Sequence, residues 1–231
     1  MGLLVLISLT AWFGLSSAVR GFENYAELSS DANLAAKLES QMLLTRLAAK
    51  HYVQTTDPAA AEAFRERLTV LRDDIALASE NINEPQRARS VALIRDEVHN
   101  YERAFNDIEA LMQRRDDVVS QTLDPNGLTA RQVLTEIMAS AYRDGDVEAA
   151  YRAGDLQESL LLMRLYAAKF LTANNASDLE RAFSELENNI RPRQAKLDSE
   201  LQNPRRRELL KQFDTAVNDY QGGLTDIGAI I

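Results

Sequence analysis

The sequence predicts an all-α protein built from two stacked four-helix bundles that share long helices. Helix-forming residues dominate its 231 residues, whereas glycine (9) and proline (5) are scarce. Apolar residues recur at spacings of three and four, and no segment alternates apolar and polar residues long enough to suggest a strand. The same three-helix pattern also occurs twice along the chain, which favours a duplicated helical unit.

Composition and charge exclude several classes of function. A net charge of −9 disfavours a nucleic-acid partner, because phosphate backbones attract clustered lysine and arginine. No cysteine is available for thiolate chemistry, and the two histidines, His51 and His99, lie far apart. No catalytic or phosphate-loop motif occurs, and no carboxylate pair can be singled out for acid–base catalysis. We therefore predict no enzyme activity, no cofactor and no metal site.

The first segment, residues 1–19, differs in kind from the rest of the chain. It carries no charged side chain before Arg20, and about 20 apolar residues are needed to cross a bilayer as a helix. This favours a transmembrane helix. No lysine or arginine precedes the apolar run, which is also typical of a sequence trimmed at this end. The alternative is a signal segment cleaved after Ser16-Ser17-Ala18. In both cases we expect residues 20–231 to be exported.

The first two helices of the exported region are separated by a proline. Apolar residues at helical spacing predict the first helix: Leu34, Leu38, Met42, Ala49, Tyr52 and Val53. It ends at Asp57-Pro58, because proline lacks an amide donor and disfavours helix in the residue before it. A second helix follows, with the sequence AAAEAFRERLTVLRDDIALASENI, and ends near Asn83 to Pro85.

A third and longer helix is predicted from Gln86 to Leu123. At 1.5 Å per residue it extends about 55 Å, enough to pack beside both shorter helices. The sequence DPNG, residues 124–127, is the clearest turn signal in the chain and is expected to end this helix.

A repeat then predicts the second half of the chain. At a shift of 119 positions, Glu39 to Ile108 matches the later sequence without a gap. The matches bring together Pro85 with Pro204 and Tyr101 with Tyr220. Keeping both the bend proline and the later tyrosine in one register indicates duplication of a helix–helix–helix unit. We expect repeat units at about residues 20–127 and 128–231.

Arg164 stands on an apolar face of its predicted helix. Its helical neighbours are all apolar: Leu160, Leu161, Ala167, Ala168 and Leu171. A guanidinium on such a face is costly unless a negative group meets it. That group is either a carboxylate of the protein or the carboxylate of a ligand, which a guanidinium binds bidentately. Arg46 leans on a similar stripe near the equivalent turn of the first unit. We expect these two arginines, on related helices that pack together, to converge on one small dianion.

The two arginine-bearing segments resemble a known family. The sequences RLAAKHYVQTTDPAAAEAF and MRLYAAKFLTANNASDLERAF are similar to the first and fourth helices of the helical bimodular sensor domain. This domain lies outside the membrane in bacterial chemoreceptors and some sensor kinases. ELQNPRRRELLKQFDTAVNDYQ similarly resembles its last hairpin, so the likeness covers about residues 32–231.

The resemblance implies a function. Members of the family sense small organic acids, with C4-dicarboxylates bound near the membrane and acetate-like ligands in the far module. Arg46 and Arg164 fall where the family's anion-binding arginines of the membrane-near bundle lie. The resemblance also implies a homodimeric receptor of the inner membrane, with its sensor domain in the periplasm and a small carboxylate as ligand.

The sequence departs from the family pattern at two places. Leu43 stands where the family tends to place a second arginine, and Lys50 lies one turn beyond Arg46. No basic residue follows Lys211, and Ile231 matches Met112 in the repeat. We therefore expect the return to the membrane and any signalling region to lie beyond this sequence.

Other candidates have plainer interpretations. Lys50 and Lys169 match in the repeat and are candidate ligand residues, although lysines on helices are usually solvated. Tyr101 and Tyr220 are candidates too, with packing as the alternative. The basic run Pro204 to Glu208 is expected to face solvent. Two further functions stay open: the input domain of a sensor histidine kinase, and a membrane-anchored helical scaffold that binds no small molecule.

Overall fold

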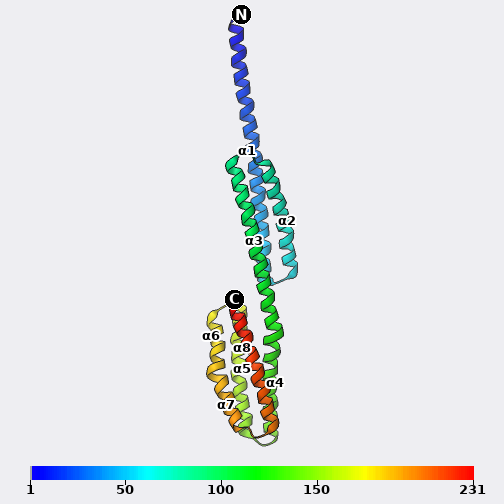
Figure 1. Ribbon diagram of the computed structural model, residues 1–231, viewed down its shortest axis with the longest axis vertical. Coiled ribbons are helices and arrows are strands. Elements are labelled where there is room, and N and C mark those ends of the chain that lie inside the picture. Colours follow the sequence, from blue (N-terminus) through cyan, green and yellow to red (C-terminus); the bar gives the residue numbers. More distant parts are fainter. Residues whose placement is uncertain (1) are drawn as a thin grey trace. The chain divides into compact units, whose positions relative to one another are not determined.

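The computed structural model describes residues 2–231, with the side chains of residue 12 and residues 14–231. Every element is helical (Figure 1): α1 (Gly2–Thr55), α2 (Pro58–Asn81), α3 (Pro85–Val118), the π-helix η1 (Val119–Leu123), α4 (Asp124–Arg143), α5 (Val147–Ala173), α6 (Ala176–Glu185), the π-helix η2 (Leu186–Ile190), α7 (Arg191–Glu200) and α8 (Pro204–Ile230). The prediction of an all-α fold is confirmed for the described chain.

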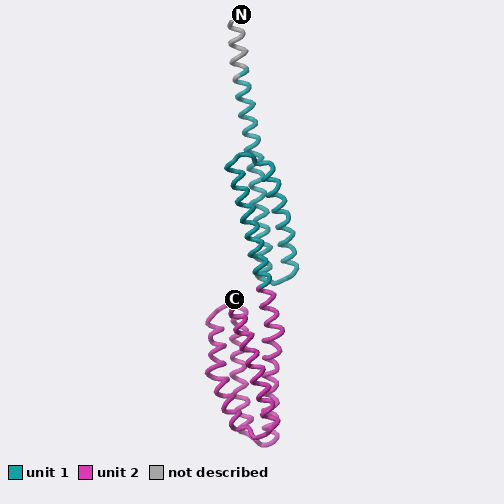
Figure 2. The backbone as a smooth tube through the Cα atoms, in the orientation of Figure 1, with its two compact units in different colours: residues 1–110 teal, residues 111–231 magenta. Residues whose placement is uncertain are grey.

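The chain forms two compact units, which Figure 2 shows in different colours. Unit 1 comprises residues 1–110 and unit 2 comprises residues 111–231. The boundary falls inside α3, so this helix contributes to both units. Unit 1 contains three helices among its described residues, and in it α1 packs along α2. Unit 2 is a four-helix bundle of α4, α5, the α6–η2–α7 segment and α8, with α4 packed against both α5 and α8.

Helix ends follow local sequence signals at the predicted breaks. The Asp57 carboxylate accepts the Ala59 amide at 2.9 Å, and Pro58 opens α2, where no amide donor is needed. Asn203 caps α8 in the same way before Pro204. The predicted breaks before Pro58, Pro85 and Pro204 are therefore confirmed.

The predicted turn at residues 124–127 is wrong, because the chain stays helical from Pro85 to Arg143. The π-helical turn η1 widens the helix just before Pro125, which has no amide to donate and would clash in a regular α-helix. The Asn126 side chain donates to the Thr122 carbonyl at 2.9 Å within this turn. The real turn lies at Gly145, whose φ of +75° suits glycine.

The repeat holds in the structure, but with a change of register. Four buried residues of α1 have buried counterparts 118 positions later in α5: Leu38 and Leu156, Thr45 and Met163, Ala49 and Ala167, and Tyr52 and Phe170. The left-handed residues that end these helices, Thr56 and Asn174, have the same spacing. From α3 to α8 the spacing is 119, as for the buried pair Val98 and Val217.

The extra residue of the second unit lies in η2. A π-helical turn accommodates one inserted residue without ending the helix, so α6, η2 and α7 together replace the regular helix α2. The predicted match without a gap, at a constant shift of 119, is therefore wrong for α1 and α5, where the shift is 118.

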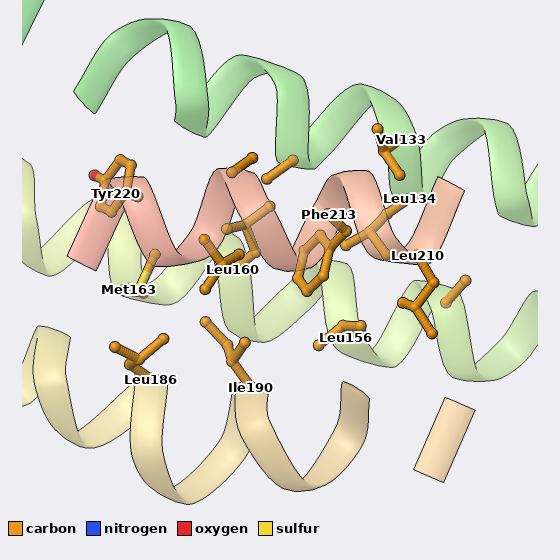
Figure 3. Close-up of a cluster of buried hydrophobic side chains, with 14 of the residues drawn as sticks. Val133, Leu134, Leu156, Leu160, Met163, Leu186, Ile190, Leu210, Phe213 and Tyr220 are labelled. Carbon is orange, nitrogen blue, oxygen red and sulfur yellow. The ribbon is translucent and has the colours of Figure 1, made fainter. Parts of the chain in front are cut away.

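The core of unit 2 lies among its four helices (Figure 3). Apolar side chains converge from every one of them, among them Leu134 of α4, Leu160 of α5, Ile190 of η2 and Phe213 of α8. Full burial of such a side chain stabilises the fold by about 1.5–3 kcal/mol. Unit 1 has a smaller core, in which the rings of Phe64 and Phe105 stack with centroids 3.7 Å apart.

Over the residues that the structure describes, no helix is apolar enough over a sufficient length to cross a membrane. The side chains of residues 1–11 and 13 lie outside the described ones. The transmembrane helix at residues 1–19 therefore stays a prediction.

Candidate functional site

The structure sorts the six predicted site residues into two sets, one in each unit. Arg46 and Lys50 of α1 lie in one groove with Tyr101 of α3. Arg164 of α5 contacts Tyr220 of α8 in unit 2. In the corrected register Arg46 corresponds to Arg164, and Tyr101 corresponds to Tyr220. The same arginine–tyrosine pair therefore occurs once in each unit. Arg46 and Arg164, which were expected to converge on one dianion, belong to different units.

The site in unit 1, which we call the cationic groove, is open to solvent. It has a volume of about 680 Å³ and is lined by Leu43, Arg46, Leu47, Ala49, Lys50, Val53, Gln54, Tyr101, Ala104, Phe105 and Ile108. Arg46 and Lys50 are exposed and lie one turn apart on α1. Burial raises the pKa of the half-buried Tyr101, and the nearby charge of Arg46 opposes that rise.

No acidic residue lines the cationic groove. Arg46 and Lys50 make no hydrogen bond or ion pair with any residue that the structure describes. Two carboxylates of α3 are engaged elsewhere in unit 1, since Arg65 of α2 bonds Glu109 at 2.7 Å and Arg72 of α2 bonds Glu102. The groove thus offers two positive charges, a phenol and apolar walls, without a protein counter-charge.

The equivalent site in unit 2 is filled by the protein itself. Arg164 is half-buried and donates from Nη1 to the Gly127 carbonyl of α4 at 3.2 Å. A Cβ at Gly127 would lie 2.7 Å from Arg164 Nε and 3.1 Å from Tyr220 Cε2. A side chain at Gly127 would therefore require the guanidinium to shift, and no carboxylate within bonding distance of Arg164 is found in the described chain.

Tyr220 completes this arrangement. Tyr220 is 4% exposed and lies beside Arg164. Burial raises the pKa of Tyr220 to about 12, against the opposing effect of the neighbouring arginine. Tyr220 is therefore a buried packing residue, and its candidate role in a ligand site stays a prediction.

The predicted match of Lys50 with Lys169 is wrong, because the register of α1 and α5 differs by one residue from the sequence match. The counterpart of Lys50 is Ala168. Lys169 is exposed and its Nζ lies 5.7 Å from the centre of the Tyr166 ring, in cation–π geometry. A second cation beside the arginine is thus a feature of unit 1 alone.

A second, apolar groove runs along α1 and α3 in unit 1. It has a volume of about 510 Å³ and is lined mainly by Leu28, Ala32, Ala35, Leu38, Met42, Val91, Ile94 and Val98. The corresponding face of unit 2 is covered by α4. Ile94 is 41% exposed, whereas its counterpart Phe213 is fully buried.

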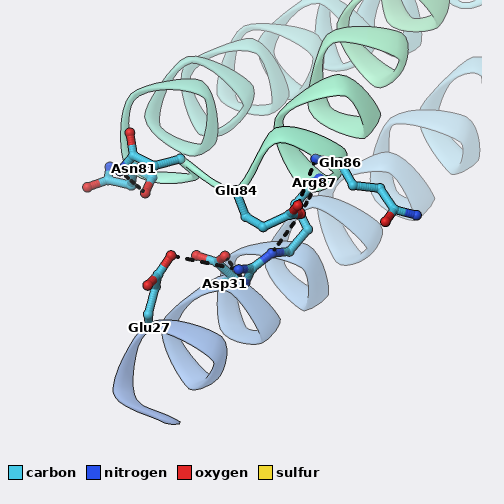
Figure 4. A network of polar contacts seen from close by, with 7 residues as sticks. Glu27, Asp31, Asn81, Glu84, Gln86 and Arg87 are labelled. Atoms are coloured by element: carbon cyan, nitrogen blue, oxygen red, sulfur yellow. Dashed lines mark hydrogen bonds and ion pairs between the residues drawn. The ribbon is translucent and has the colours of Figure 1, made fainter. Parts of the chain in front are cut away.

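Two further arginines are engaged in ion networks at equivalent positions. Arg87 of α3 bonds Asp31 and also contacts Glu27 and Glu84 (Figure 4). Its counterpart Arg206 is 3% exposed and bonds Asp144, Asp146 and Ser140. The expectation that the run from Pro204 to Glu208 faces solvent is therefore wrong for Arg206, because the acidic turn after α4 covers its side chain. Both networks join helix ends and need no ligand.

Comparisons with family models and with curated proteins find no match for this chain. The resemblance to the helical bimodular sensor domain therefore rests on the quoted segments, and the assignment stays a prediction.

Proposed function

We propose that the chain is the extracytoplasmic ligand-binding domain of a transmembrane chemoreceptor, and that it binds a small organic acid in the cationic groove. The observation that carries this proposal is the pair Arg46 and Lys50, two cations one turn apart in an open groove without a protein carboxylate. The likeness of both arginine-bearing segments to the helical bimodular sensor domain supports the same ligand class.

The groove suits a small carboxylate chemically. A guanidinium binds a carboxylate through two parallel N–H donors, and the Lys50 ammonium adds a second positive point charge. Leu43, Leu47 and Ile108 give the ligand's carbon chain an apolar surface, and the Tyr101 hydroxyl is available to donate. A dicarboxylate reaches both cations, whereas acetate engages one of them.

Binding would connect two helices. Arg46 and Lys50 belong to α1, and Tyr101 belongs to α3, so a ligand held by all three favours one packing of α1 against α3. A ligand shifts a conformational equilibrium only by its difference in affinity for the two states. The resulting slide or rotation of α1 would carry the signal along the helix toward the predicted membrane segment, in a homodimer.

Calorimetric titration tests the proposal. Succinate, malate, citrate and acetate are titrated into the 231-residue chain, its Arg46→Gln variant and an Arg67→Gln control. Arg67 is exposed on α2 and unpaired within the described chain, so it matches Arg46 in charge and exposure. We expect at least one acid to bind, Arg46→Gln to weaken it at least about tenfold, and Arg67→Gln to leave it unchanged. Binding that survives Arg46→Gln unaltered would refute the site.

A helical scaffold that binds a protein partner is the second candidate, and the exposed apolar groove of unit 1 favours it. A thermal-shift screen separates the two. A ligand at about 100 times its dissociation constant adds about 2.7 kcal/mol to the free energy of unfolding, whereas a scaffold gains nothing from any organic acid. The sensor-kinase alternative shares the ligand chemistry and differs only in the output region.

A further inference from the structure

We infer that an ion pair whose charges are inverted between the two units directs each helix to its own partner, so that α1 pairs with α2 and α5 pairs with α7. In unit 1, Lys37 of α1 bonds Asp74 of α2 at 2.6 Å. In unit 2, Asp155 of α5 contacts Arg193 Nε of α7 at 3.3 Å. The first helix therefore carries the cation in unit 1 and the anion in unit 2.

The two ion pairs occupy equivalent positions of the repeat. Lys37 and Asp155 lie 118 residues apart, which is the spacing of the buried residues of α1 and α5. Asp74 and Arg193 lie 119 apart, which is the spacing of the second segment of each unit beyond the residue inserted in η2. Buried residues of these segments share it: Leu71 and Ile190, and Ala78 and Leu197. Both contacts are complete within the described residues, so the inversion is a property of the two helix pairs themselves.

The apolar contacts beside these ion pairs are alike in the two units. Leu38 of α1 corresponds to Leu156 of α5, and both are buried. Leu68 of α2 corresponds to Leu186 of η2, and both are buried as well. The free energy of burial depends on the apolar area removed from water and has no direction. At these positions a helix of one unit would therefore bury the same residue types against the partner segment of the other unit.

Charge distinguishes the correct pairing from the wrong one. If α1 packed against α7 in the equivalent register, Lys37 would face Arg193. If α5 packed against α2, Asp155 would face Asp74. Each wrong pairing loses an attraction between opposite charges and gains a repulsion between like charges, which is how specific interfaces reject competing partners.

The burial of Asp74 makes the contact in unit 1 sensitive to its partner. The Asp74 side chain is 9% exposed and bonds Lys37. Its second oxygen, Oδ2, is buried without a hydrogen-bond partner among the described residues. An exposed ion pair adds little to stability, but a buried carboxylate that loses its counter-charge is costly. The wrong pairing of α5 with α2 would place a second carboxylate at this position.

A third residue completes each set. In unit 2 the buried Ser159 accepts a hydrogen bond from Arg193, which also donates to the Asp155 carbonyl at 2.9 Å. The counterpart of Ser159 in unit 1 is Gln41, which lies one turn from Lys37. We call these sets the unit 1 triad, Lys37, Gln41 and Asp74, and the unit 2 triad, Asp155, Ser159 and Arg193.

Exchange of the two triads tests the inference. Variant A gives unit 1 the residues of the unit 2 triad, variant B gives unit 2 those of the unit 1 triad, and variant AB carries both exchanges. The substitutions are Lys37→Asp, Gln41→Ser and Asp74→Arg in variant A, and Asp155→Lys, Ser159→Gln and Arg193→Asp in variant B. Variants A and B each give both units the same charge order, whereas variant AB restores opposite orders.

Refolding of the full 231-residue chain is the measurement. Each variant is unfolded in urea and refolded at about 1 to 100 μM protein, because misassembly of transiently exposed helices rises with concentration. Size-exclusion chromatography and circular dichroism give the fraction that recovers the elution volume and helicity of the unchanged chain. We expect this fraction to fall at least about twofold over the concentration range in variants A and B, and to be restored in variant AB.

The double exchange separates pairing specificity from simple stability. Variant AB carries all of the substitutions, so a purely structural role of the triads predicts the lowest recovery for AB. Recovery of AB no better than that of A and B, or full recovery of A and B at every concentration, would overturn the inference. If A or B does not fold at the lowest concentration, AB alone decides: refolding of AB supports the inference, and its failure to refold contradicts it.

Discussion

Units 1 and 2 place the same residues at equivalent positions and differ in what covers them. In unit 2, α4 packs against α5 and α8, Phe213 and Tyr220 are buried, and Arg164 is half-buried. In unit 1 the equivalent face of α1 and α3 is open, with Ile94 and Arg46 in contact with solvent. The comparison teaches that the burial of a duplicated arginine–tyrosine pair depends on the helix packed against it: α4 packs over the pair in unit 2, whereas Arg46 is exposed in the described part of unit 1.

The largest effect is expected from the core position that the two units bury differently. Phe213→Ala removes a fully buried ring and should lower the free energy of unfolding by about 3–5 kcal/mol. Ile94→Ala, at the equivalent position of unit 1, should cost less than about 1 kcal/mol because that side chain is 41% exposed. Urea unfolding followed by circular dichroism measures both. Equal losses would contradict the difference in coverage.

The paired ion networks should give the next largest difference. Arg206→Ala removes hydrogen bonds to two carboxylates from a buried guanidinium and should cost about 2–3 kcal/mol. Arg87→Ala acts on a half-buried network and should cost about 1 kcal/mol. Urea unfolding followed by circular dichroism measures both variants. A larger loss in Arg87→Ala than in Arg206→Ala would contradict the difference between the two networks.

The tyrosines give a pH-dependent difference. Burial raises the pKa of Tyr220 to about 12, above its usual value near 10. Below pH 10 both folded and unfolded chains keep the proton, so stability is unaffected. Between pH 10 and 12 this tyrosine ionises only in the unfolded chain. The free energy of unfolding therefore falls by about 1 kcal/mol per pH unit.

Substitution of each tyrosine checks this assignment. Tyr220→Phe should flatten the loss of stability between pH 10 and 12 markedly. Tyr101→Phe should flatten it less, because Tyr101 is only half-buried. Tyrosinate absorbance recorded alongside the unfolding curves identifies the ionising group, and a larger effect at Tyr101 would reverse the comparison.

Substitution of two adjacent glycines of α8 by alanine should change the free energy of unfolding in opposite directions. Gly223→Ala brings a Cβ to 2.7 Å from Leu123 and should destabilise unit 2 by about 1–2 kcal/mol. Gly222→Ala has nothing within 4 Å of the new Cβ and should stabilise the helix by up to about 1 kcal/mol. Thermal unfolding of the two variants is the measurement. Stabilisation by both would show that η1 does not press on α8.

Much of the fold could be predicted from periodicity and proline. Pro58, Pro85 and Pro204 each open a helix, because proline suits a first turn and disfavours the residue before it. The same reasoning failed at Pro125, where η1 absorbs the missing amide. A π-helical turn has no strong sequence signal, so neither this helix nor the inserted residue in η2 was predictable.

The candidate site was predictable in part. Helical spacing places Arg46 and Lys50 one turn apart, and the repeat points to Tyr101. The role of Gly127 was missed, because DPNG is typical of a turn and a backbone carbonyl leaves no trace in sequence. Arg206 was missed as well, since its burial depends on Asp144 and Asp146, which lie about 60 residues earlier in the chain.

Side-chain NMR of the arginines tests the central claim most directly. Two-dimensional ¹H–¹⁵N spectra resolve the Nε–H groups, and Arg46→Lys and Arg164→Lys variants assign the two signals in the 231-residue chain. On titration with succinate, the Arg46 signal should shift and saturate with the calorimetric dissociation constant, while the Arg164 signal, held at Gly127, stays in place. A saturable shift of Arg164 with Arg46 unmoved would contradict the account.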